Sequence, residues 1–113
     1  FSEWHGKPVY RSKVMRYSEG SFVDEHIDSQ WMCHSNWWEP ETNMVSDALV
    51  VIPLNDDFEG GDFTVNGGIK IDQDVGFAIE VPQSGDRSRP SVRHGVSKVT
   101  KGTRYALVFW TFV

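Results

Sequence analysis

The sequence is poor in cysteine, in long apolar runs and in basic residues, and each of these shortages excludes a class of protein. A single cysteine, Cys33, excludes an internal disulfide framework and fits a reducing compartment, so we expect the cytoplasm. No apolar run is long enough to cross a membrane, and the opening residues do not form a signal peptide. Lysine and arginine number 11 against 16 acidic residues, and the net charge of −5 argues against a nucleic-acid-binding surface. The chain begins on Phe1 rather than Met, which leaves room for an upstream segment.

Aromatic and apolar residues, by contrast, are plentiful. The 113 residues are 39% hydrophobic and include five Trp, seven Phe and three Tyr. This composition predicts a folded chain, and its length allows one modest core. We therefore expect a single domain over residues 1–113.

The apolar pattern predicts β-strands separated by glycine and proline, without a helical stripe. The expected strands are 9–17, 21–28, 47–55, two runs within 63–71, 76–82, 92–99 and 104–113. Asn66-Gly67-Gly68 tolerates the positive φ of a tight hairpin, so a turn is predicted there. Pro53 lacks a ladder donor and predicts an edge strand or a bulge at its position. Seven or eight short strands predict an all-β sandwich or jelly roll.

His26-Ile27-Asp28 is the strongest chemical signal in the sequence. On a strand, residues two apart point to the same face, so the imidazole of His26 and the carboxylate of Asp28 would project together. His94 follows Asp28 by 66 positions and adds a second imidazole. Two histidines and one carboxylate are the donors of the facial triad that holds Fe(II) and leaves positions open. The sequence therefore predicts a metal site of His26, Asp28 and His94.

Arg104 follows His94 by ten residues, and we expect a hairpin, turning at Lys101-Gly102, to bring it alongside the strand of His94. A guanidinium among apolar side chains is costly to bury without an anion. A carboxylate would pair with it through two hydrogen bonds. That carboxylate belongs either to an oxoacid bound at the metal or to an acidic side chain of the protein. The residues expected on the same strand face as Arg104 are Ala106, Val108, Trp110 and Phe112.

Taken in order, these residues resemble the Fe(II)/2-oxoglutarate-dependent dioxygenases, and most of all their prolyl 4-hydroxylase-type catalytic domain. The matching segments are Tyr17-Ser-Glu-Gly20, His26-Ile-Asp28, Leu54 through Gly60-Gly61-Asp62-Phe63, Gly76, and His94 through Arg104 to Trp110. The resemblance implies a double-stranded β-helix, which is a jelly roll, and we expect this chain to lack the helices that usually support one of its sheets.

The resemblance also implies roles for individual residues and a reaction. The iron ligands and catalytic residues would be His26, Asp28 and His94, while Arg104, Tyr17 and Trp110 would line the 2-oxoglutarate site. Arg104 would bind the distal carboxylate of the co-substrate, Tyr17 would assist it, and Trp110 would lie near the floor of the site. The implied reaction consumes O2 and hydroxylates an unactivated C–H bond, most of all in a prolyl residue of a peptide or protein. Succinate and CO2 would be released.

Three positions depart from the family pattern. Glu19 replaces the usual proline before Gly20, no arginine is evident near Ser46, and Leu49 stands where threonine is common. In the family these positions lie near the co-substrate or the substrate. The departures therefore bear on prolyl specificity and leave the predicted metal site unaffected.

Other functions and roles remain open from the sequence. The chain could be a non-catalytic jelly roll that binds a metal structurally or binds a small acid, as a cupin-like module does. As an enzyme it could act on a free amino acid, another small molecule, another protein side chain or, least in keeping with its acidic charge, an alkylated base. Arg87, Arg89 and Arg93 form either a solvated loop or a clamp for an anionic or peptidic substrate. Trp37 and Trp38 either wall a substrate pocket or pack in the core.

Overall fold

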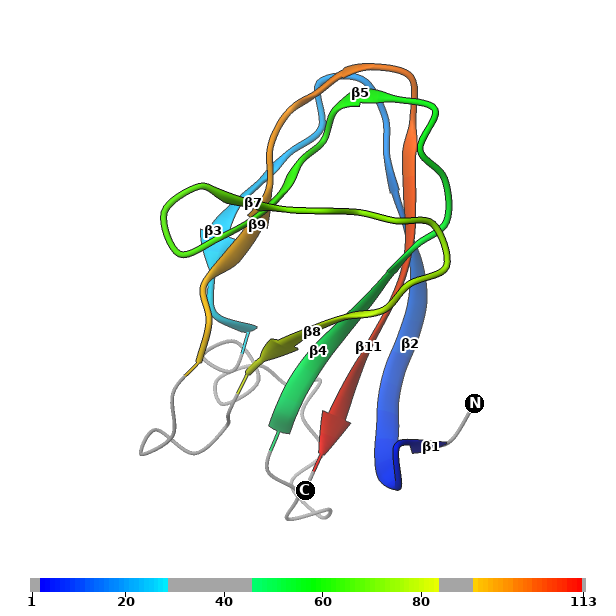
Figure 1. Cartoon of the computed structure of the whole chain (residues 1–113), viewed down its shortest axis with the longest axis vertical. Helices are drawn as coiled ribbons and strands as arrows, with labels where there is room; N and C mark the ends of the chain where they lie inside the picture. The colour runs from blue at the N-terminus through cyan, green and yellow to red at the C-terminus, as the bar shows by residue number, and fades with distance from the viewer. Residues whose placement is uncertain (1–2, 29–45, 84–90, 113) are drawn as a thin grey trace.

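The computed structural model describes residues 3–28, 46–83 and 91–112 (Figure 1). All the elements defined within these ranges are strands: β1 (Glu3–Trp4), β2 (Lys7–Tyr17), β3 (Val23–His26), β4 (Ser46–Pro53), β5 (Glu59–Gly60), β6 (Phe63–Val65), β7 (Ile69–Ile71), β8 (Ile79–Pro82), β9 (His94–Val96), β10 (Val99–Lys101) and β11 (Arg104–Phe112). The all-β prediction is confirmed, and the expected lack of supporting helices fits these ranges. Within them, no helix has the length and apolarity to span a membrane.

The strands form two antiparallel sheets that enclose the interior, with a short ribbon at one end (Figure 1). The larger sheet has the order β1-β2-β11-β4-β8, and the smaller sheet has the order β3-β9-β6-β7. The ribbon pairs β10 with β5. The last strand, β11, lies between β2 and β4, so strands distant in sequence become neighbours. This crossed connectivity is that of a jelly roll, as predicted.

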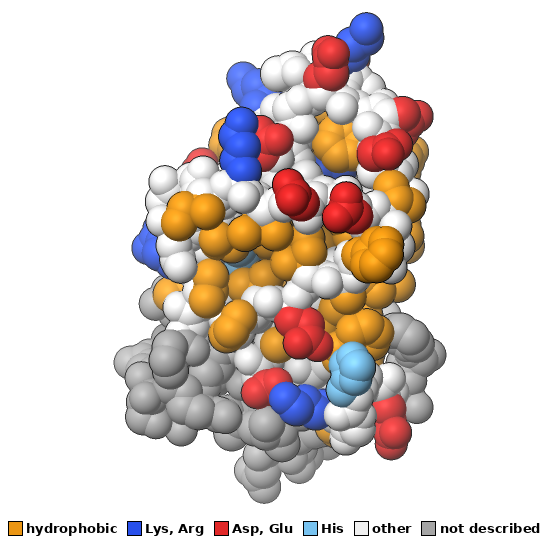
Figure 2. Space-filling view, viewed as in Figure 1, with side chains coloured by type: hydrophobic (Ala, Val, Ile, Leu, Met, Phe, Trp, Pro, Cys, Tyr) orange, Lys and Arg blue, Asp and Glu red, His pale blue; other side chains and the backbone are white. Residues whose placement is uncertain are grey.

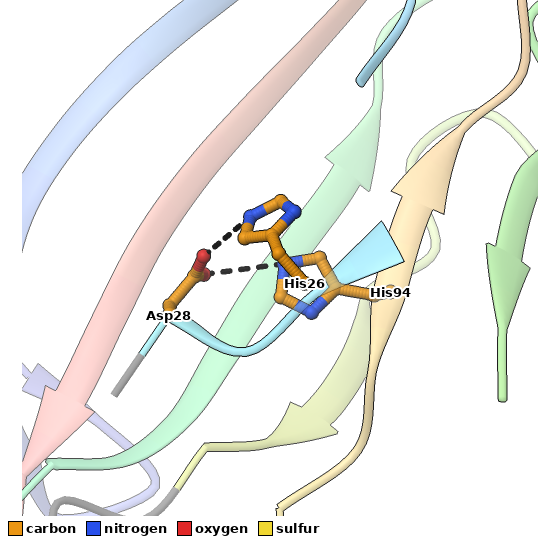
Figure 3. A group of neighbouring side chains, drawn as sticks. All are labelled: His26, Asp28 and His94. Carbon is orange, nitrogen blue, oxygen red and sulfur yellow. Dashed lines mark ion pairs between the residues drawn. The ribbon is translucent and has the colours of Figure 1, made fainter. Parts of the chain in front are cut away.

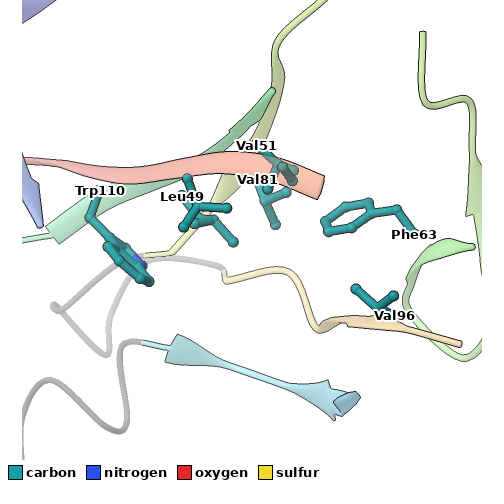
Figure 4. Close-up of a cluster of buried hydrophobic side chains, with 8 residues drawn as sticks. Leu49, Val51, Phe63, Val81, Val96 and Trp110 are labelled. Carbon is teal, nitrogen blue, oxygen red and sulfur yellow. The ribbon is translucent and has the colours of Figure 1, made fainter. Parts of the chain in front are cut away.

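The hydrophobic core lies between the two sheets. It consists of Leu49, Val51, Phe63, Val81, Val96, Ala106, Val108 and Trp110. Leu49 and Val51 are two apart on β4, so strand alternation turns both toward the interior. Figure 4 shows the larger sheet's side chains pointing toward Phe63 and Val96 of the smaller sheet. One face of β4 and one face of β11 therefore form a wall of the interior.

A register shift divides the long strand β2. Lys13 pairs with Val108 of β11, and the register changes beyond this pair, where Arg11 adopts a φ of 56°. An extra residue in one strand turns the residues beyond it to the other face. The common face predicted for residues 9–17 therefore holds only from Lys13 to Tyr17. This half of β2 lines the interior.

The predicted hairpin joins β6 to β7. Val65 pairs with Ile69, and Asn66, Gly67 and Gly68 have φ values of 46°, 92° and 99°. The carboxylate of Glu25 accepts hydrogen bonds from the N–H groups of Gly67 and Gly68 at 2.6 and 2.7 Å. The turn prediction is confirmed, and the turn is tied to β3 of the same sheet.

Pro53 occupies a different position from the one predicted. It is the last residue of β4, which is an internal strand, and it pairs with Ala106 of β11. The adjacent hydrogen bond on that side runs from the Leu54 N–H to the Tyr105 carbonyl, at 3.0 Å. Because backbone groups alternate in direction, the Pro53 nitrogen faces the β8 side, where pairing ends at Val51. No ladder donor is required there, so neither an edge nor a bulge is needed.

Several large apolar side chains remain exposed. Figure 2 shows apolar side chains gathered across the middle of one face, with acidic side chains above and below them. The exposed large hydrophobic residues are Val14, Phe22, Leu54, Ile69, Val75, Phe77 and Tyr105. Val14 and Tyr105 lie on the side of the larger sheet that faces away from the core, since their strand neighbours face inward.

Candidate metal centre and co-substrate pocket

The two predicted histidine ligands are brought together by the pairing of β3 with β9. His26 lies directly opposite His94 in the register, and the ring centroids are 4.5 Å apart. Gly95 allows the two strands to approach closely, since a Cβ there would lie 2.7 Å from the Val23 carbonyl oxygen and 2.9 Å from the Glu25 nitrogen. The absence of a side chain at Gly95, next to His94, therefore determines how closely the two imidazoles can approach each other.

Asp28 completes the group of ligands just beyond the end of β3. Its Oδ1 lies 2.7 Å from Nε2 of His26, and its Oδ2 lies 3.2 Å from Nε2 of His94. Figure 3 shows both rings turned toward this carboxylate. One ligand atom from each of the three residues falls within 4.8 Å of the others. Three donors so close together can bind a single ion.

Backbone carbonyls hold the far side of each ring. Nδ1 of His26 lies 2.8 Å from the Asp24 carbonyl, and Nδ1 of His94 lies 3.4 Å from the Val92 carbonyl. A carbonyl only accepts, so when Nε2 serves as a metal ligand the hydrogen of the neutral ring lies on Nδ1. Two imidazole nitrogens and one carboxylate are the donor set of a facial-triad Fe(II) site, so these residues fit that metal.

The ionisation of the group depends on the same contacts. Burial raises the pKa of Asp28, but the hydrogen bonds from His26 and His94 outweigh it, and the net pKa lies well below the usual value. The hydrogen bond to Asp28 raises the pKa of His26, against the effect of burial. In the metal-free protein the carboxylate is therefore ionised and favours a proton on the imidazole. A metal ion at this position would take the place of that proton.

Gln83 fixes the backbone at Asp28, which lies beyond the last ladder pair of β3. Its side chain is fully buried, and its Oε1 accepts a hydrogen bond from the Asp28 N–H at 2.5 Å. Its Nε2 donates to the carbonyls of Pro82, at 2.7 Å, and Val92. Val92 lies two residues before His94, so one side chain connects the end of β8 to both ligand-bearing segments.

A cavity of about 230 Å³ lies between the sheets, directly beside the three ligands. It is smaller than the usual site for a drug-sized molecule and suits a small acid. The lining residues are Lys13, Met15, Tyr17, Val23, His26, Asp28, Leu49, Val51, Phe63, His94, Gly95, Val96, Arg104, Val108 and Trp110. Both sheets contribute, and most of the lining is apolar.

Arg104 lies in this cavity, 2% exposed. Its Nε donates to Oε1 of Gln73 at 2.8 Å, and Nε2 of Gln73 donates to the Gly61 carbonyl at 2.9 Å. The guanidinium carbon lies 5.0 Å from the centre of the Tyr17 ring. Among the described residues, Nη2 of Arg104 is the buried side-chain atom that lacks a hydrogen-bond partner. A buried donor that faces a cavity in this way fits the distal carboxylate of 2-oxoglutarate.

The path of the chain to Arg104 differs from the predicted hairpin. His94 lies on β9 of the smaller sheet, whereas Arg104 begins β11 of the larger sheet. Between them, β10 pairs with β5 instead of with either strand. The hairpin prediction is therefore wrong, because the chain crosses from one sheet to the other. Arg104 approaches the cavity from the wall opposite His94, which leaves the space between them open to a ligand.

Tyr17 and Trp110 occupy different parts of the cavity. Tyr17 pairs with Arg104 across β2 and β11, and burial raises the pKa of its hydroxyl. The indole N–H of Trp110 donates to Oδ2 of Asp28 at 3.1 Å. Tyr17 therefore lies at the arginine end of the cavity. Trp110 lies at the carboxylate of the metal group rather than beside Arg104.

The departures from the family pattern fall in separate places. Leu49 lines the cavity, whereas Glu19 accepts a hydrogen bond from the Gly102 N–H at 3.1 Å and is not among the lining residues. Glu19 thus links two turns and does not face the candidate ligands. The side chain of Ser46 is not among those the structure describes.

The arginine cluster and the tryptophan pair are only partly described. Arg93 donates from Nη2 to the Glu25 carbonyl at 3.2 Å, an exposed contact. The other members, Arg87, Arg89, Trp37 and Trp38, lie outside the described residues, so both alternatives for their roles stay predictions.

Three residues of the site were not predicted from the sequence: Gln83, Gln73 and Lys13. Gln73 and Gln83 follow β7 and β8 in connections of polar sequence, and nothing in the local sequence pattern indicates that their side chains enter the site. Lys13 gave a usable signal, because it shares a predicted strand face with Met15 and Tyr17. Its position in the cavity lining follows from that alternation.

Comparison with known proteins places this arrangement among described families. Residues 12–112 match the family model of the 2OG-Fe(II) oxygenase superfamily. Human prolyl 3-hydroxylase 2 is 35% identical over 82 residues, which cover 66% of this chain and 11% of that protein. A PKHD-type hydroxylase of Alteromonas mediterranea is 32% identical over 98 residues, covering 84% of this chain and 40% of the relative. The chain thus spans well under half the length of these curated relatives.

A solved structure supports the same fold. It is an oxidoreductase of the 2OG-Fe(II) oxygenase family from Burkholderia pseudomallei, matched with a TM-score of 0.64 and 24% sequence identity. The match covers 93% of this chain and 44% of that structure. At this identity the likeness bears on the fold, which agrees with the jelly roll described above.

Proposed function

Because the chain belongs to the 2OG-Fe(II) oxygenase superfamily, we propose that it is an Fe(II)- and 2-oxoglutarate-dependent dioxygenase that hydroxylates an unactivated C–H bond. One observation carries the proposal. The ligand group of His26, Asp28 and His94 and the unpartnered Nη2 of Arg104 border the same apolar cavity, from opposite walls. A metal-binding dicarboxylic acid would satisfy both.

The proposed roles follow from the contacts. His26, Asp28 and His94 hold Fe(II), with the tautomers of both rings fixed by backbone carbonyls. Arg104, oriented by Gln73, binds and orients the far carboxylate of 2-oxoglutarate. The bound metal and oxoacid supply the activation of O2, with release of CO2 and succinate and transfer of one oxygen atom to the substrate.

The surrounding residues protect and tune this chemistry. Leu49, Val51 and Val108 line the cavity with apolar surface, which excludes water from the reacting centre. Trp110 donates a hydrogen bond to Oδ2 of Asp28, so that oxygen is partly neutralised and the carboxylate orientation is fixed. Tyr17 presents its ring to the guanidinium of Arg104 and stabilises that charge where burial opposes it.

The substrate we propose is a prolyl residue of a peptide or protein, by analogy with the relatives named as prolyl and PKHD-type hydroxylases. A free amino acid or another small molecule is the alternative within the same chemistry. Residues 1–113 are proposed to form one domain. A cytoplasmic location is proposed from the single cysteine, since a reducing compartment keeps such thiols free.

The test is a coupled turnover assay. Purified protein, Fe(II), 2-oxoglutarate and O2 are incubated with proline-containing peptides and with free amino acids. We expect equal amounts of succinate and of a product heavier by one oxygen atom, both abolished in Asp28→Ala and retained in Arg16→Met. Arg16 is an exposed residue on the outward face of β2. A folded protein that binds metal yet forms no succinate with any substrate would favour the non-catalytic binding module instead.

A further inference from the structure

The cavity has a second cationic residue, Lys13, which the proposed roles do not use. Lys13 lies on β2 opposite Val108 and lines the cavity, and its side chain is exposed. Its Nζ lies over the Trp110 ring, 5.3 Å from the ring centroid. Among the described residues that line the cavity, Asp28 is the one acidic residue, and no ion pair in this part of the chain includes Lys13.

The two cations lie over different rings of the cavity wall, Lys13 over Trp110 and Arg104 over Tyr17. Tyr17, opposite Arg104, is four residues from Lys13 along β2, which corresponds to about 13 Å of strand. A five-carbon dicarboxylic acid spans only about 5 Å between its end carbons at ordinary bond lengths. Moreover, Lys13 leans toward Trp110, away from Arg104. An oxoacid held by Arg104 therefore leaves the ammonium of Lys13 unpaired.

Lys13 is nevertheless close to the metal group. The indole under its ammonium donates its N–H to Asp28, so a single side chain separates Lys13 from a proposed iron ligand. The cavity thus has a buried cation at one end, Arg104 at 2% exposure, and an exposed cation beside the metal group. The wall between them is apolar and includes Met15, Leu49 and Val108.

Building on the proposed function, we propose that Lys13 binds a carboxylate of the primary substrate and so directs the adjacent apolar part of that substrate to the metal. An ammonium at a partly exposed site pairs readily with a carboxylate, and the ring beneath it limits its freedom. Two sources of the carboxylate share this chemistry. One is the free α-carboxylate of an amino acid or C-terminal residue, and the other is an acidic side chain next to an internal target residue.

The experiment measures substrate binding without turnover. Wild-type protein is loaded anaerobically with Fe(II) and 2-oxoglutarate, and the change in the metal-to-ligand charge-transfer band is titrated with three probes. The probes are acetyl-alanyl-proline, its C-terminal amide, and the same amide with glutamate in place of alanine. Lys13→Met, Lys13→Arg and the outward-facing control Arg16→Met are titrated in parallel.

We expect at least one carboxylate-bearing probe to bind about fivefold more tightly than the plain amide, the scale of a partly exposed ion pair. Lys13→Met should remove this preference, whereas Lys13→Arg and Arg16→Met should retain it. All four proteins should require the same concentration of 2-oxoglutarate. Whichever acidic probe shows the preference identifies the source of the carboxylate.

Results that contradict the assignment of Lys13 can be distinguished from results that contradict the proposed dioxygenase function. Equal binding of acid and amide probes, an unchanged preference in Lys13→Met, or no binding of any probe would overturn the assignment of Lys13. Each of those results requires a charge-transfer band to be present. Loss of the band itself, in folded protein, would instead contradict the proposed dioxygenase function, so the two failures are separable.

Discussion

The side-chain oxygen of Gln83 accepts a hydrogen bond from the backbone N–H of Asp28 at 2.5 Å, inside a fully buried environment. The same carboxamide donates to the carbonyl of Val92, two residues before His94. The amide of Gln83 therefore sets the separation of two ligand-bearing segments that are 66 residues apart in sequence. Asp28 lies beyond the last residue of β3, so this contact replaces the strand ladder as the means of positioning it.

Replacing Gln83 with methionine should weaken metal binding more than it weakens the fold. The substitution keeps the side-chain length but removes the side-chain hydrogen bonds to Asp28, Pro82 and Val92, and it leaves the Asp28 N–H buried without this acceptor. We expect the dissociation constant for Mn(II), measured by quenching of tryptophan fluorescence, to rise about tenfold, in line with the effect of residues that orient metal ligands.

Val50→Ala is the matched control for this variant. Val50 is fully buried, but it alternates with Leu49 and Val51 and so faces away from the cavity. Its truncation should lower the free energy of unfolding by roughly 2 kcal/mol and leave the Mn(II) affinity unchanged. If both variants bound Mn(II) as the wild type does, Gln83 would be a structural residue without influence on the metal site.

Gly95→Ala should separate the two histidines. The added Cβ would lie 2.7 Å from the Val23 carbonyl oxygen and 2.9 Å from the Glu25 nitrogen, both of them backbone atoms of β3. Backbone atoms cannot rotate aside, so β3 and β9 must move apart where His26 faces His94. We expect a loss of roughly 1–3 kcal/mol in stability by chemical denaturation, together with loss of Mn(II) binding. Retained affinity in this variant would show that the pairing of these strands does not determine ligand geometry.

Gln73→Leu should act on 2-oxoglutarate and not on the metal. Gln73 accepts from Nε of Arg104 and donates to the Gly61 carbonyl, so it fixes the direction of the guanidinium. Without it, Arg104 would lose this orientation and a second buried nitrogen would lack a partner. The concentration of 2-oxoglutarate at half-saturation should rise about tenfold at unchanged Mn(II) affinity. An equal loss of both affinities would point to a general disturbance of the cavity.

Metal affinity should fall as the pH is lowered, starting above the ordinary histidine range. The metal requires neutral His26, whereas the hydrogen bond to Asp28 raises the pKa of His26 above its reference value of about 6.5. The proton therefore competes with the metal from a higher pH than at an ordinary histidine. Displacement of one proton predicts up to about a tenfold weaker Mn(II) affinity per pH unit below that pKa. Constant affinity from about pH 7.5 to 5.5 would contradict the assignment.

The metal-free protein should show the opposite trend in that range. Since the pKa of His26 is raised in the folded state, its contribution to stability is complete below about pH 6.5 and is lost as the pH rises through the raised pKa. The lowered pKa of Asp28 keeps its contribution present until the pH falls into the acidic range. Thermal unfolding with and without Mn(II), from about pH 6 to 8.5, should therefore show two slopes of opposite sign.

Local periodicity and turn chemistry were enough to predict much of the fold. The turn at residues 66–68 lies where Asn66, Gly67 and Gly68 predicted it, because these residues tolerate positive φ. The apolar run of β4 forms an internal strand, as expected of a strand buried on both faces. The candidate ligands were predictable because residue type alone specifies their chemistry. The path from His94 to Arg104 was not predictable, because a turn at Gly102 does not reveal that β9 and β11 belong to different sheets.

The supporting residues were beyond prediction for a related reason. A glutamine after a strand is usually solvated, and only the tertiary contacts bury Gln83 between Asp28 and Val92. Likewise, the bulge near Arg11 has no proline or glycine to announce it, so the inward face of β2 ends earlier than alternation predicts. Non-local pairing determines such features, and one sequence carries little information about it.

We expect one cavity to bind Fe(II) and 2-oxoglutarate together, and an anaerobic titration with both, followed by visible absorption, tests this most directly. We predict a metal-to-ligand charge-transfer band in the wild type that is absent in Asp28→Ala. In Arg104→Ala the band should require far more 2-oxoglutarate. No band in folded wild-type protein, or an undiminished band in Asp28→Ala, would contradict the account.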